Sequence, residues 1–232
     1  MKKASVETKQ RRRKNGQIRE AWRRMVHNKK AVGAMIVLAI LLFIVIFADF
    51  ISPYSKGTEL DVINRLIAPC KEYWFGTDAY GRDLFTRIIH GSRMSLLMGF
   101  GATFISATIG TLIGTTSAYL GGRTDSIIMR LLDMWMAIPS LLVTLAIIAG
   151  VGVGIPQMIG ALAFGGIPGF ARVLRASALG VVNQEFIESA RALGAKSSRI
   201  VVKYIIPNVM SQFLVQSTMN VSGTILLGAT LS

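Results

Sequence analysis

The sequence is poor in the residues on which soluble enzymes and disulfide-stabilised proteins depend. Charged residues make up 16% of its 232 residues, there are only two histidines, and Cys70 is the single cysteine. One cysteine excludes an intrachain disulfide bond and leaves the redox compartment undetermined. A soluble domain of this size would carry about a quarter charged residues, so the deficit indicates a membrane protein.

Motifs of nucleotide binding and catalysis are also missing. The phosphate-binding pattern G-x4-G-K-[ST] does not occur, and the nearest match, GAKS at 194–197, lacks the glycine before the lysine. The glycine run at 150–156 follows no strand, as a dinucleotide-binding motif would. His27 and His90 have no nucleophile placed beside them. We therefore expect no enzymatic activity, no cofactor and no metal ion.

Apolar residues, in contrast, are abundant. They make up 52% of the chain, and the mean hydropathy is +0.51. The longest uncharged stretch, 134–171, would measure about 57 Å as one helix, nearly twice the hydrocarbon core, so we divide it into two spans at 150–156. The sequence thus predicts an all-α, polytopic membrane bundle with five transmembrane helices: 31–51, 94–122, two within 134–171, and 204–232.

The Lys and Arg residues are distributed unevenly around these spans. The segments 1–30, 121–133 and 172–203 hold 20 of the 26, and the segment 52–93 holds the other six. By the positive-inside rule, the first three segments are cytoplasmic and so is the N-terminus. The net charge of +14 does not indicate a nucleic-acid partner, because no basic groove is interleaved with aromatic residues.

The basic tail 1–30 leaves two interpretations open. Ile18, Trp22, Met25 and Val26 share one helical face, which favours a helix lying on the inner leaflet. A solvated tail that only fixes the orientation fits equally well. The span that follows is not a signal peptide, because it ends in DFISP rather than in a small-x-small cleavage site.

One stretch between two apolar segments, 184–207, is too polar to cross a membrane. Phe186, Ala190 and Leu193 fall on one helical face. Gly194 offers a positive-φ stop, after which a second short helix can begin. We therefore expect two short amphipathic helices joined by a glycine turn.

Two further features of this stretch bear on its shape. Glu188 and Arg191 are three residues apart and could pair beside the apolar face. Pro207 should limit how far the second helix runs.

The spacing within this stretch carries a resemblance. The pattern E-S-A-x3-G-x9-Y-x-I-P comprises Glu188, Ser189, Ala190, Gly194, Tyr204, Ile206 and Pro207. It resembles the EAA loop of membrane subunits of ATP-binding-cassette (ABC) importers, E-A-A-x3-G-x9-I-x-L-P, which docks into a groove on the ATPase subunit. Ser189, Tyr204 and Ile206 depart from it mildly. The alternative is an ordinary amphipathic loop. The resemblance implies an ATPase-coupling role for Glu185, Glu188, Ser189, Ala190, Arg191, Gly194, Ala195, Ile206 and Pro207.

A second block lies in the segment expected outside. FGTDAYGRD at 75–83, continued by Arg87, Gly91, Arg93 and Ser95, resembles a block of the dipeptide, oligopeptide and nickel branch of these permeases. Without the resemblance it would be a turn with a surface ion pair, worth little in stability. A carboxylate metal site is conceivable, but no His or Cys lies at ligand spacing.

A third resemblance covers 121–139, where the family has G-G-x-x-D, M-R-x-x-D and a closing proline. Arg130 and Asp133 are three apart there and can pair. Simple anchoring at the membrane interface would explain the charges as well.

Small and polar residues inside the spans suggest their packing. Gly101, Ser106, Gly110 and Gly114 should place the second span inside the bundle, because small residues let helices approach closely. The glycines and proline of the fourth span should bend or break it, which makes that span a candidate for the translocation pathway. The fifth span adds polar residues every four positions, for interhelical hydrogen bonds or for the pathway. The pathway candidates are Gly165, Pro168, Gln212, Gln216 and Asn220.

The resemblance implies a permease subunit of an ABC importer in the bacterial plasma (inner) membrane. It would transport peptides, or alternatively nickel or another small solute. The implied partners are a homologous second permease, two ATPase subunits, an external solute-binding protein and the lipid bilayer. An ion-coupled secondary transporter is disfavoured, because the only acid near a span is Asp49, at its end.

The expected organisation has four parts: a basic tail 1–30, a first transmembrane helix 31–51, an external segment 52–93, and a permease core 94–232 with a coupling loop 184–207. The family resembled has six spans, and this sequence stops inside the segment that follows the fifth. We therefore expect a truncated product, and a fragment that assembles without transporting is an open alternative.

Overall fold

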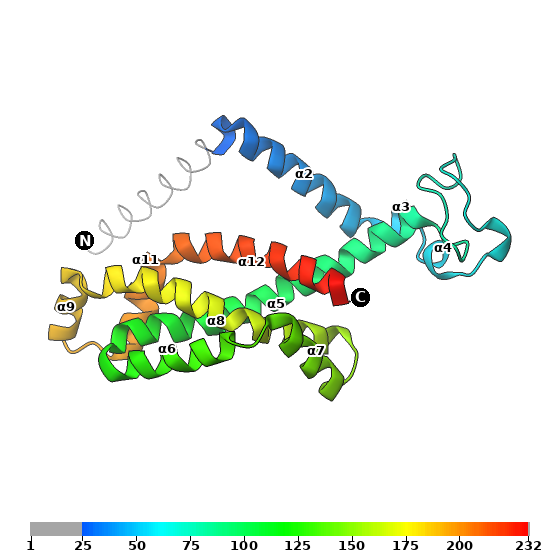
Figure 1. The fold of residues 1–232 in the computed structure, drawn as a ribbon. Coiled ribbons are helices and arrows are strands. Elements are labelled where there is room, and N and C mark those ends of the chain that lie inside the picture. The colour runs from blue at the N-terminus through cyan, green and yellow to red at the C-terminus, as the bar shows by residue number, and fades with distance from the viewer. Residues whose placement is uncertain (1–24, 232) are drawn as a thin grey trace. The chain divides into compact units, whose positions relative to one another are not determined.

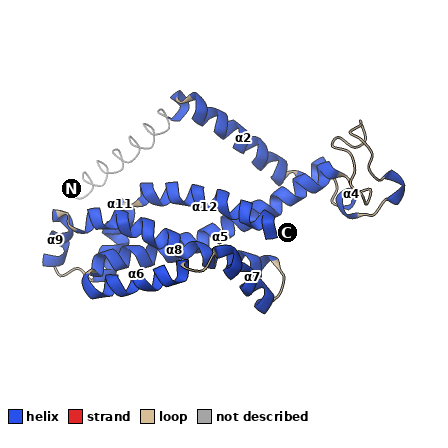
Figure 2. Cartoon of the chain, in the orientation of Figure 1, coloured by secondary structure: helices blue, strands red, loops and turns tan. Residues whose placement is uncertain are grey.

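The computed structural model describes residues 25–231 of the chain. Every regular element in this range is helical, and the residues described form no strand beyond one isolated bridge between Thr77 and Asp83 (Figure 2). The all-α prediction is therefore confirmed. The chain divides into two compact units, Met1–Arg93 and Met94–Ser232.

The first unit contains the beginning of the membrane-embedded chain and the segment that follows it. α2 spans Lys29–Ile46 and begins where the side chain of Asn28 accepts hydrogen bonds from the N–H groups of Lys30 and Ala31. The short helices after it are α3 (Ala48–Ile51), α4 (Ser55–Thr58) and η1 (Val62–Asn64). Most of the tail, including Ile18 and Trp22, lies outside the described residues, so the surface-helix interpretation stays a prediction.

α5 spans Leu84–Leu120 and is the longest helix described (Figure 1). Its 37 residues measure about 56 Å, because each residue adds about 1.5 Å. The helix thus begins ten residues before residue 94, the expected start of the second span. Arg87 and Arg93 lie within the helix, because charged side chains are compatible with helical backbone.

The glycines of α5 lie where the second span was expected to pack closely. A Cβ added at Gly110 would lie 2.5 Å from the Cβ of Phe170, and one added at Gly114 would lie 2.2 Å from the carbonyl oxygen of Ala171. Both contacts are with α8 (Ile155–Val182). The prediction that small residues bring this helix into the bundle is confirmed.

The short link at 121–125, within the segment 121–133 expected on the cytoplasmic side, is helical almost throughout. α6 runs from Gly122 to Met136, and α7 (Ser140–Val151) follows after a bend of 78°. The bend falls at Pro139, because the residue before a proline is disfavoured in helical conformation. α7 has only 12 residues, about 18 Å, so the third apolar segment is a bent pair of helices.

The predicted turn at 150–156 is confirmed. α7 ends at Val151, Gly152 has φ +97°, and α8 begins at Ile155 with Pro156 in its first turn. Of the two alternatives predicted for this span, a break does not occur, because α8 continues through Pro168 to Val182, and a bend stays a prediction. Pro168 is fully buried. The ring of a proline in a helix approaches the residue four positions earlier, and the next two residues, Gly165 and Gly166, have no side chains that would crowd it. One backbone hydrogen bond is lost, and packing on α5 retains the helix.

The C-terminal helix α12 spans Met210–Leu231. Three helices are long and apolar enough to cross a membrane, α2, α5 and α8, or four if the bent pair α6–α7 counts as one span. α12 has the length but not the hydropathy, since Gln212, Gln216 and Asn220 interrupt its apolar residues. The described residues therefore contain three to four candidate membrane spans.

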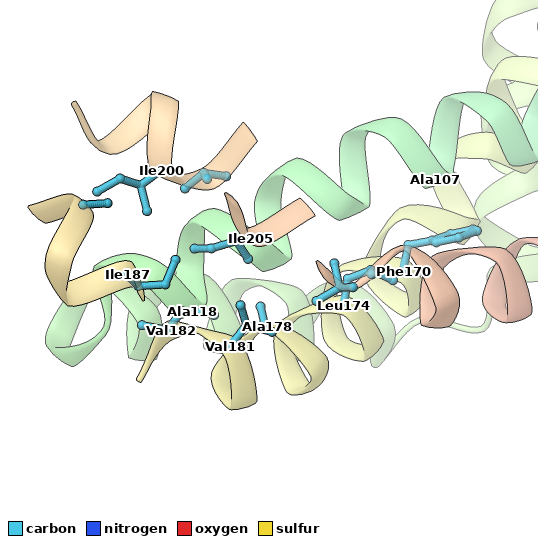
Figure 3. Packing of buried hydrophobic residues seen from close by; sticks show 13 residues of the cluster. Ala107, Ala118, Phe170, Leu174, Ala178, Val181, Val182, Ile187, Ile200 and Ile205 are labelled. Atoms are coloured by element: carbon cyan, nitrogen blue, oxygen red, sulfur yellow. The ribbon is translucent and has the colours of Figure 1, made fainter. Parts of the chain in front are cut away.

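The larger apolar core of the second unit lies where three parts of the chain meet. Figure 3 shows Ala178, Val181 and Val182 of α8 near Ala118 of α5. Other members belong to the segment after α8 and include Ile187, Ile200 and Ile205, all with no exposed surface. The segment expected to be a coupling loop is thus packed against α5 and α8 through this apolar core.

Candidate functional site

The coupling loop folds as two short helices joined at Gly194, as predicted. α9 spans Glu185–Ala192 and α10 spans Ser197–Ile200. Gly194 has φ +74°, its N–H bonds the carbonyl of Arg191, and the N–H of Ala195 bonds the carbonyl of Ala190. These two bonds form a Schellman motif, which ends a helix where a residue adopts left-handed conformation.

The buried face of α9 contains only one of the three apolar residues that were grouped on one face, Ala190. Ile187 is completely buried and Ala190 is 7% exposed, whereas Phe186 is 38% and Leu193 87% exposed. Ile187 and Ala190 are three apart and so share a face that points into the core. Helical periodicity alone fitted both faces, and only contact with α5 and α8 decides between them.

The charged residues of α9 are arranged differently from the expected pair. The guanidinium carbon of Arg191 lies 4.6 Å from the ring centre of Tyr119, at the end of α5, and no ion pair joins it to Glu188 among the residues described. Glu185, Glu188 and Ser189 are exposed on the outer side of the helix. The outer side of α9 and its C-terminal end therefore expose two carboxylates and two large apolar side chains.

Pro207 does not end the second helix. A π-helical segment, η2 (Val201–Ile205), follows α10, and α11 (Ile206–Asn208) has Pro207 in its first turn. The N–H of Ile206 bonds the carbonyl of Val201, five residues back. The wider turn accommodates the proline, so the chain stays helical to Asn208, and one turn residue, Val209, precedes α12. Ala195 and Ile206 pack against the core, and Pro207 is exposed.

Charged side chains join the helices beneath the loop. Arg175 on α8 donates from Nε to Oδ1 of Asp125 on α6 over 2.6 Å, and Ser117 on α5 donates to the same oxygen over 2.6 Å. The side chain of Asp125 is 12% exposed and that of Arg175 is 27% exposed. A partly buried, hydrogen-bonded ion pair therefore connects three helices.

A second pair shows where the sequence prediction failed. Asp133 was expected to pair with Arg130 but pairs with Arg172 of α8. Both arginines of α8 had been counted only as topological charges. Their spacing of three in an otherwise apolar helix was the signal that they face one neighbouring helix.

Two cavities lie between α7, α8 and α12, with volumes of about 280 and 390 Å³. Both are lined by Ser140, Gly165, Gly166 and Asn220. Four of the predicted pathway residues therefore come together here: Gly165, Pro168, Gln216 and Asn220. Gln212 is exposed and lines neither cavity. Trp135, Ser140 and Thr224 also line these cavities and were missed, because single residues of these types carry no periodic signal.

The second predicted block, at 75–83, forms a closed network in the first unit. The carboxylate of Asp78 accepts hydrogen bonds from the N–H groups of Tyr80 and Arg82 and from the side chains of Arg82 and Arg87. Burial would raise the pKa of Asp78, but these hydrogen bonds outweigh it and lower the pKa from 3.8 to about 2. Among the described residues no cluster of three or more His, Cys, Asp or Glu side chains could hold a metal ion.

Comparison with known proteins matches most of the chain. Residues 106–232 match the family described as binding-protein-dependent transport system inner membrane component, and residues 16–69 match the N-terminal transmembrane domain of oligopeptide transport permease C. The chain is 39% identical over 213 residues to the glutathione transport system permease protein GsiD of Escherichia coli O6:K15:H31 (strain 536), covering 92% of this chain and 70% of GsiD. It is 37% identical, with the same coverage, to the dipeptide transport system permease protein DppC of Alkalihalophilus pseudofirmus.

Proposed function

Because the chain belongs to the family of inner membrane components of binding-protein-dependent transport systems, we propose that it carries short peptides and is driven through its α9–α10 loop. Membership makes it a permease subunit of an ABC importer in the inner membrane, and it is not itself an enzyme. Such a system implies ATPase subunits and an external binding protein as partners. The residues used for each contact are the subject of the proposal.

The observation that carries the proposal is the outward side of α9. The side chain of Leu193, immediately before the glycine turn, is 87% exposed, and that of Phe186, seven residues earlier, is 38% exposed. An apolar side chain this exposed on a cytoplasmic loop gains free energy when a partner covers it. Glu185 and Glu188 beside it would supply charge that fixes the orientation of the ATPase subunit.

Movement of the loop would pass into the membrane helices through the core beneath it. Ile187 and Ile200 are fully buried against α8 and α5, and Arg191 lies on Tyr119. Closely packed interiors transmit displacement rather than absorbing it. ATP-driven closure of the ATPase subunits would therefore rock the attached helices as a rigid body and switch access to the pathway.

The lining of the cavities supports a peptide over nickel. The residues around both cavities include serine, threonine, asparagine and glutamine side chains but no Asp, Glu, His or Cys. Amide and hydroxyl groups bind peptide bonds, whereas nickel prefers imidazole, thiolate or carboxylate ligands. The relatives with assigned solutes are named for glutathione and dipeptides, which agrees with this chemistry.

The topology that we propose has five spans with a cytoplasmic N-terminus. α12 would be the fifth, since its 22 residues measure about 33 Å and its polar residues Gln216 and Asn220 face the cavities of the bundle. The charge distribution supports this orientation, because 20 of the 26 Lys and Arg residues fall on the segments placed inside. The external block would then face the binding protein.

Two substitutions in the loop test the coupling role. Gly194→Val places a β-branched residue at φ +74° and should lower peptide-stimulated ATPase activity and uptake together. Leu193→Asp leaves the backbone intact and should weaken ATPase binding by about tenfold or more. Leu60→Asp is the matched control, a leucine that is 69% exposed in the external segment. Normal ATPase binding and uptake in both loop variants would refute the proposal.

A further inference from the structure

We propose that the side-chain amide of Asn220 is a hydrogen-bond donor for the peptide-bond carbonyl of the transported solute. The proposal rests on the pathway role assigned above and names a specificity-determining residue within it. Asn220 lines both cavities and is the eleventh of the 22 residues of α12, at the middle of the helix. Solute sites of membrane transporters commonly lie at this depth.

The orientation of the amide is fixed by two hydroxyl groups. Oδ1 of Asn220 accepts a hydrogen bond from Oγ1 of Thr103 on α5 over 2.9 Å and from Oγ1 of Thr224 over 3.3 Å. Both acceptor positions of that oxygen are then occupied. The NH2 group is held on the opposite side and has no acceptor among the residues that the structure describes.

The surroundings of the NH2 group are kept open by a missing side chain. A Cβ added at Gly166 would lie 3.4 Å from Nδ2 of Asn220, and the same glycine lines both cavities. Any larger residue at this position would cover the amide. Two N–H donors therefore remain available at the junction of the cavities, with Gln216 on the next turn of α12 toward the loop.

A second donor without an acceptor lies in the lining of the smaller cavity. The indole N–H of Trp135 is buried and has no hydrogen-bond partner among the described residues. A buried donor without a partner is rare in proteins and carries a free-energy penalty that a ligand oxygen can remove. Because no Lys, Arg or His lines either cavity, these neutral donors suit a neutral carbonyl oxygen.

A purely structural role for Asn220 would use Oδ1 alone. The hydrogen bond from Thr103 joins α5 to α12, and interhelical bonds of this kind stabilise membrane bundles. Asn220→Asp separates the two roles, because aspartate keeps an oxygen for Thr103 and Thr224 but has no N–H donors. A structural role predicts little change in solute preference for this variant, and a donor role predicts a large one.

The test compares a dipeptide with its thioamide analogue, in which sulfur replaces the peptide-bond oxygen and accepts hydrogen bonds more weakly. The complete importer, with second permease, ATPase subunits and binding protein, is reconstituted in proteoliposomes, and ATP-dependent uptake of both solutes is measured. The preference of the binding protein is common to all variants, so a changed uptake ratio is caused by this chain. We expect Asn220→Asp to reduce the preference for the oxygen compound by about tenfold, the effect of one hydrogen bond.

The matched control is Gln212→Glu, the same amide-to-carboxylate change on an exposed residue of the same helix, and it should leave the ratio unchanged. Thr103→Val, which frees the amide to rotate, should also reduce the preference, and it serves if the aspartate variant fails to assemble. Wild-type ratios in both Asn220→Asp and Thr103→Val would overturn the inference while peptide uptake itself upholds the proposed function. Absence of ATP-dependent peptide uptake by the wild-type importer would overturn both.

Discussion

The external block at 75–83 and the coupling loop at 184–207 both turn on glycines with positive φ, yet their surroundings differ. A Cβ added at Gly81 would lie 1.6 Å from the carbonyl oxygen of Asp61, and one at Gly76 would lie 2.4 Å from that of Ile67. Gly194 has no atom within 4 Å of the same position. The first loop packs tightly against the preceding chain at Asp61 and Ile67, and the second leaves its turn open.

The polar groups of the two regions follow the same division. Asp78 accepts four hydrogen bonds inside its own block, while Glu185 and Glu188 of the coupling loop point outward with no ion pair among the described residues. The block 75–83 also exchanges backbone hydrogen bonds with Lys56, Asp61 and Ile67, which hold it in one shape. We propose that the second loop, which is anchored from beneath and has unused outer groups, is covered by a partner.

The largest expected effect on stability comes from replacing the glycine in each of the two turns by alanine. Gly81→Ala should destabilise the protein by at least about 4 kcal/mol, because the added methyl overlaps a backbone carbonyl. Gly194→Ala should cost only about 1–2 kcal/mol, the penalty of left-handed backbone without a clash. Thermal unfolding of the purified protein in detergent measures both, and equal losses would contradict the distinction.

The next largest effect concerns the ion pair between Asp125 and Arg175, which joins the helices beneath the coupling loop. Asp125→Leu leaves Arg175 partly buried without its partner and should cost about 3 kcal/mol. Asp133→Leu is the control, since its pair with Arg172 is exposed and should contribute less than about 1 kcal/mol. If both variants unfold at the same temperature, the pair of Asp125 and Arg175 does not stabilise the packing of α6 on α8.

Acid should loosen the external block before it affects the coupling loop. The pKa of Asp78 is about 2 in the folded protein against 3.8 ordinarily, so the stabilisation is complete above about pH 4 and is lost as the pH falls through 2. Pepsin cleavage within 60–83 should therefore increase over this interval. Asp78→Asn should be cleaved equally at pH 4 and pH 2, and a wild-type-like pH profile in that variant would assign the acid sensitivity to another group.

The smallest expected effect concerns the contact that joins α9 to α5. The contact between Arg191 and the ring of Tyr119 should contribute about 0.5–1 kcal/mol. A double-mutant cycle with Arg191→Leu and Tyr119→Leu measures this coupling energy. An interaction energy of zero would leave the apolar core as the only link between the two helices.

The features that the sequence predicted correctly depend on local chemistry. The helical class, the turn at 150–156 and the left-handed glycine at 194 follow from hydropathy and from the conformational freedom of glycine. The close approach of α5 was predictable for the same reason, because Gly110 and Gly114 lack side chains. Each of these properties is fixed within a few residues of the chain.

The features that were predicted wrongly depend on which helices become neighbours. Asp133 could reach Arg130 in its own helix, but α8 brings Arg172 within range instead. Ile187 rather than Phe186 is buried, because α9 meets α5 and α8 from one side only. The cavity residues Trp135 and Ser140 come together only when α6 and α7 bend at Pro139.

Site-directed cross-linking tests the central claim most directly. Cys70 is the only cysteine, so Cys70→Ser provides a background in which Leu193→Cys or Leu60→Cys carries a single thiol-reactive probe. We predict that the probe at 193 cross-links to an ATPase subunit in the assembled importer and that the probe at 60 does not. Cross-linking of the ATPase from residue 60, with none from residue 193, would contradict the account.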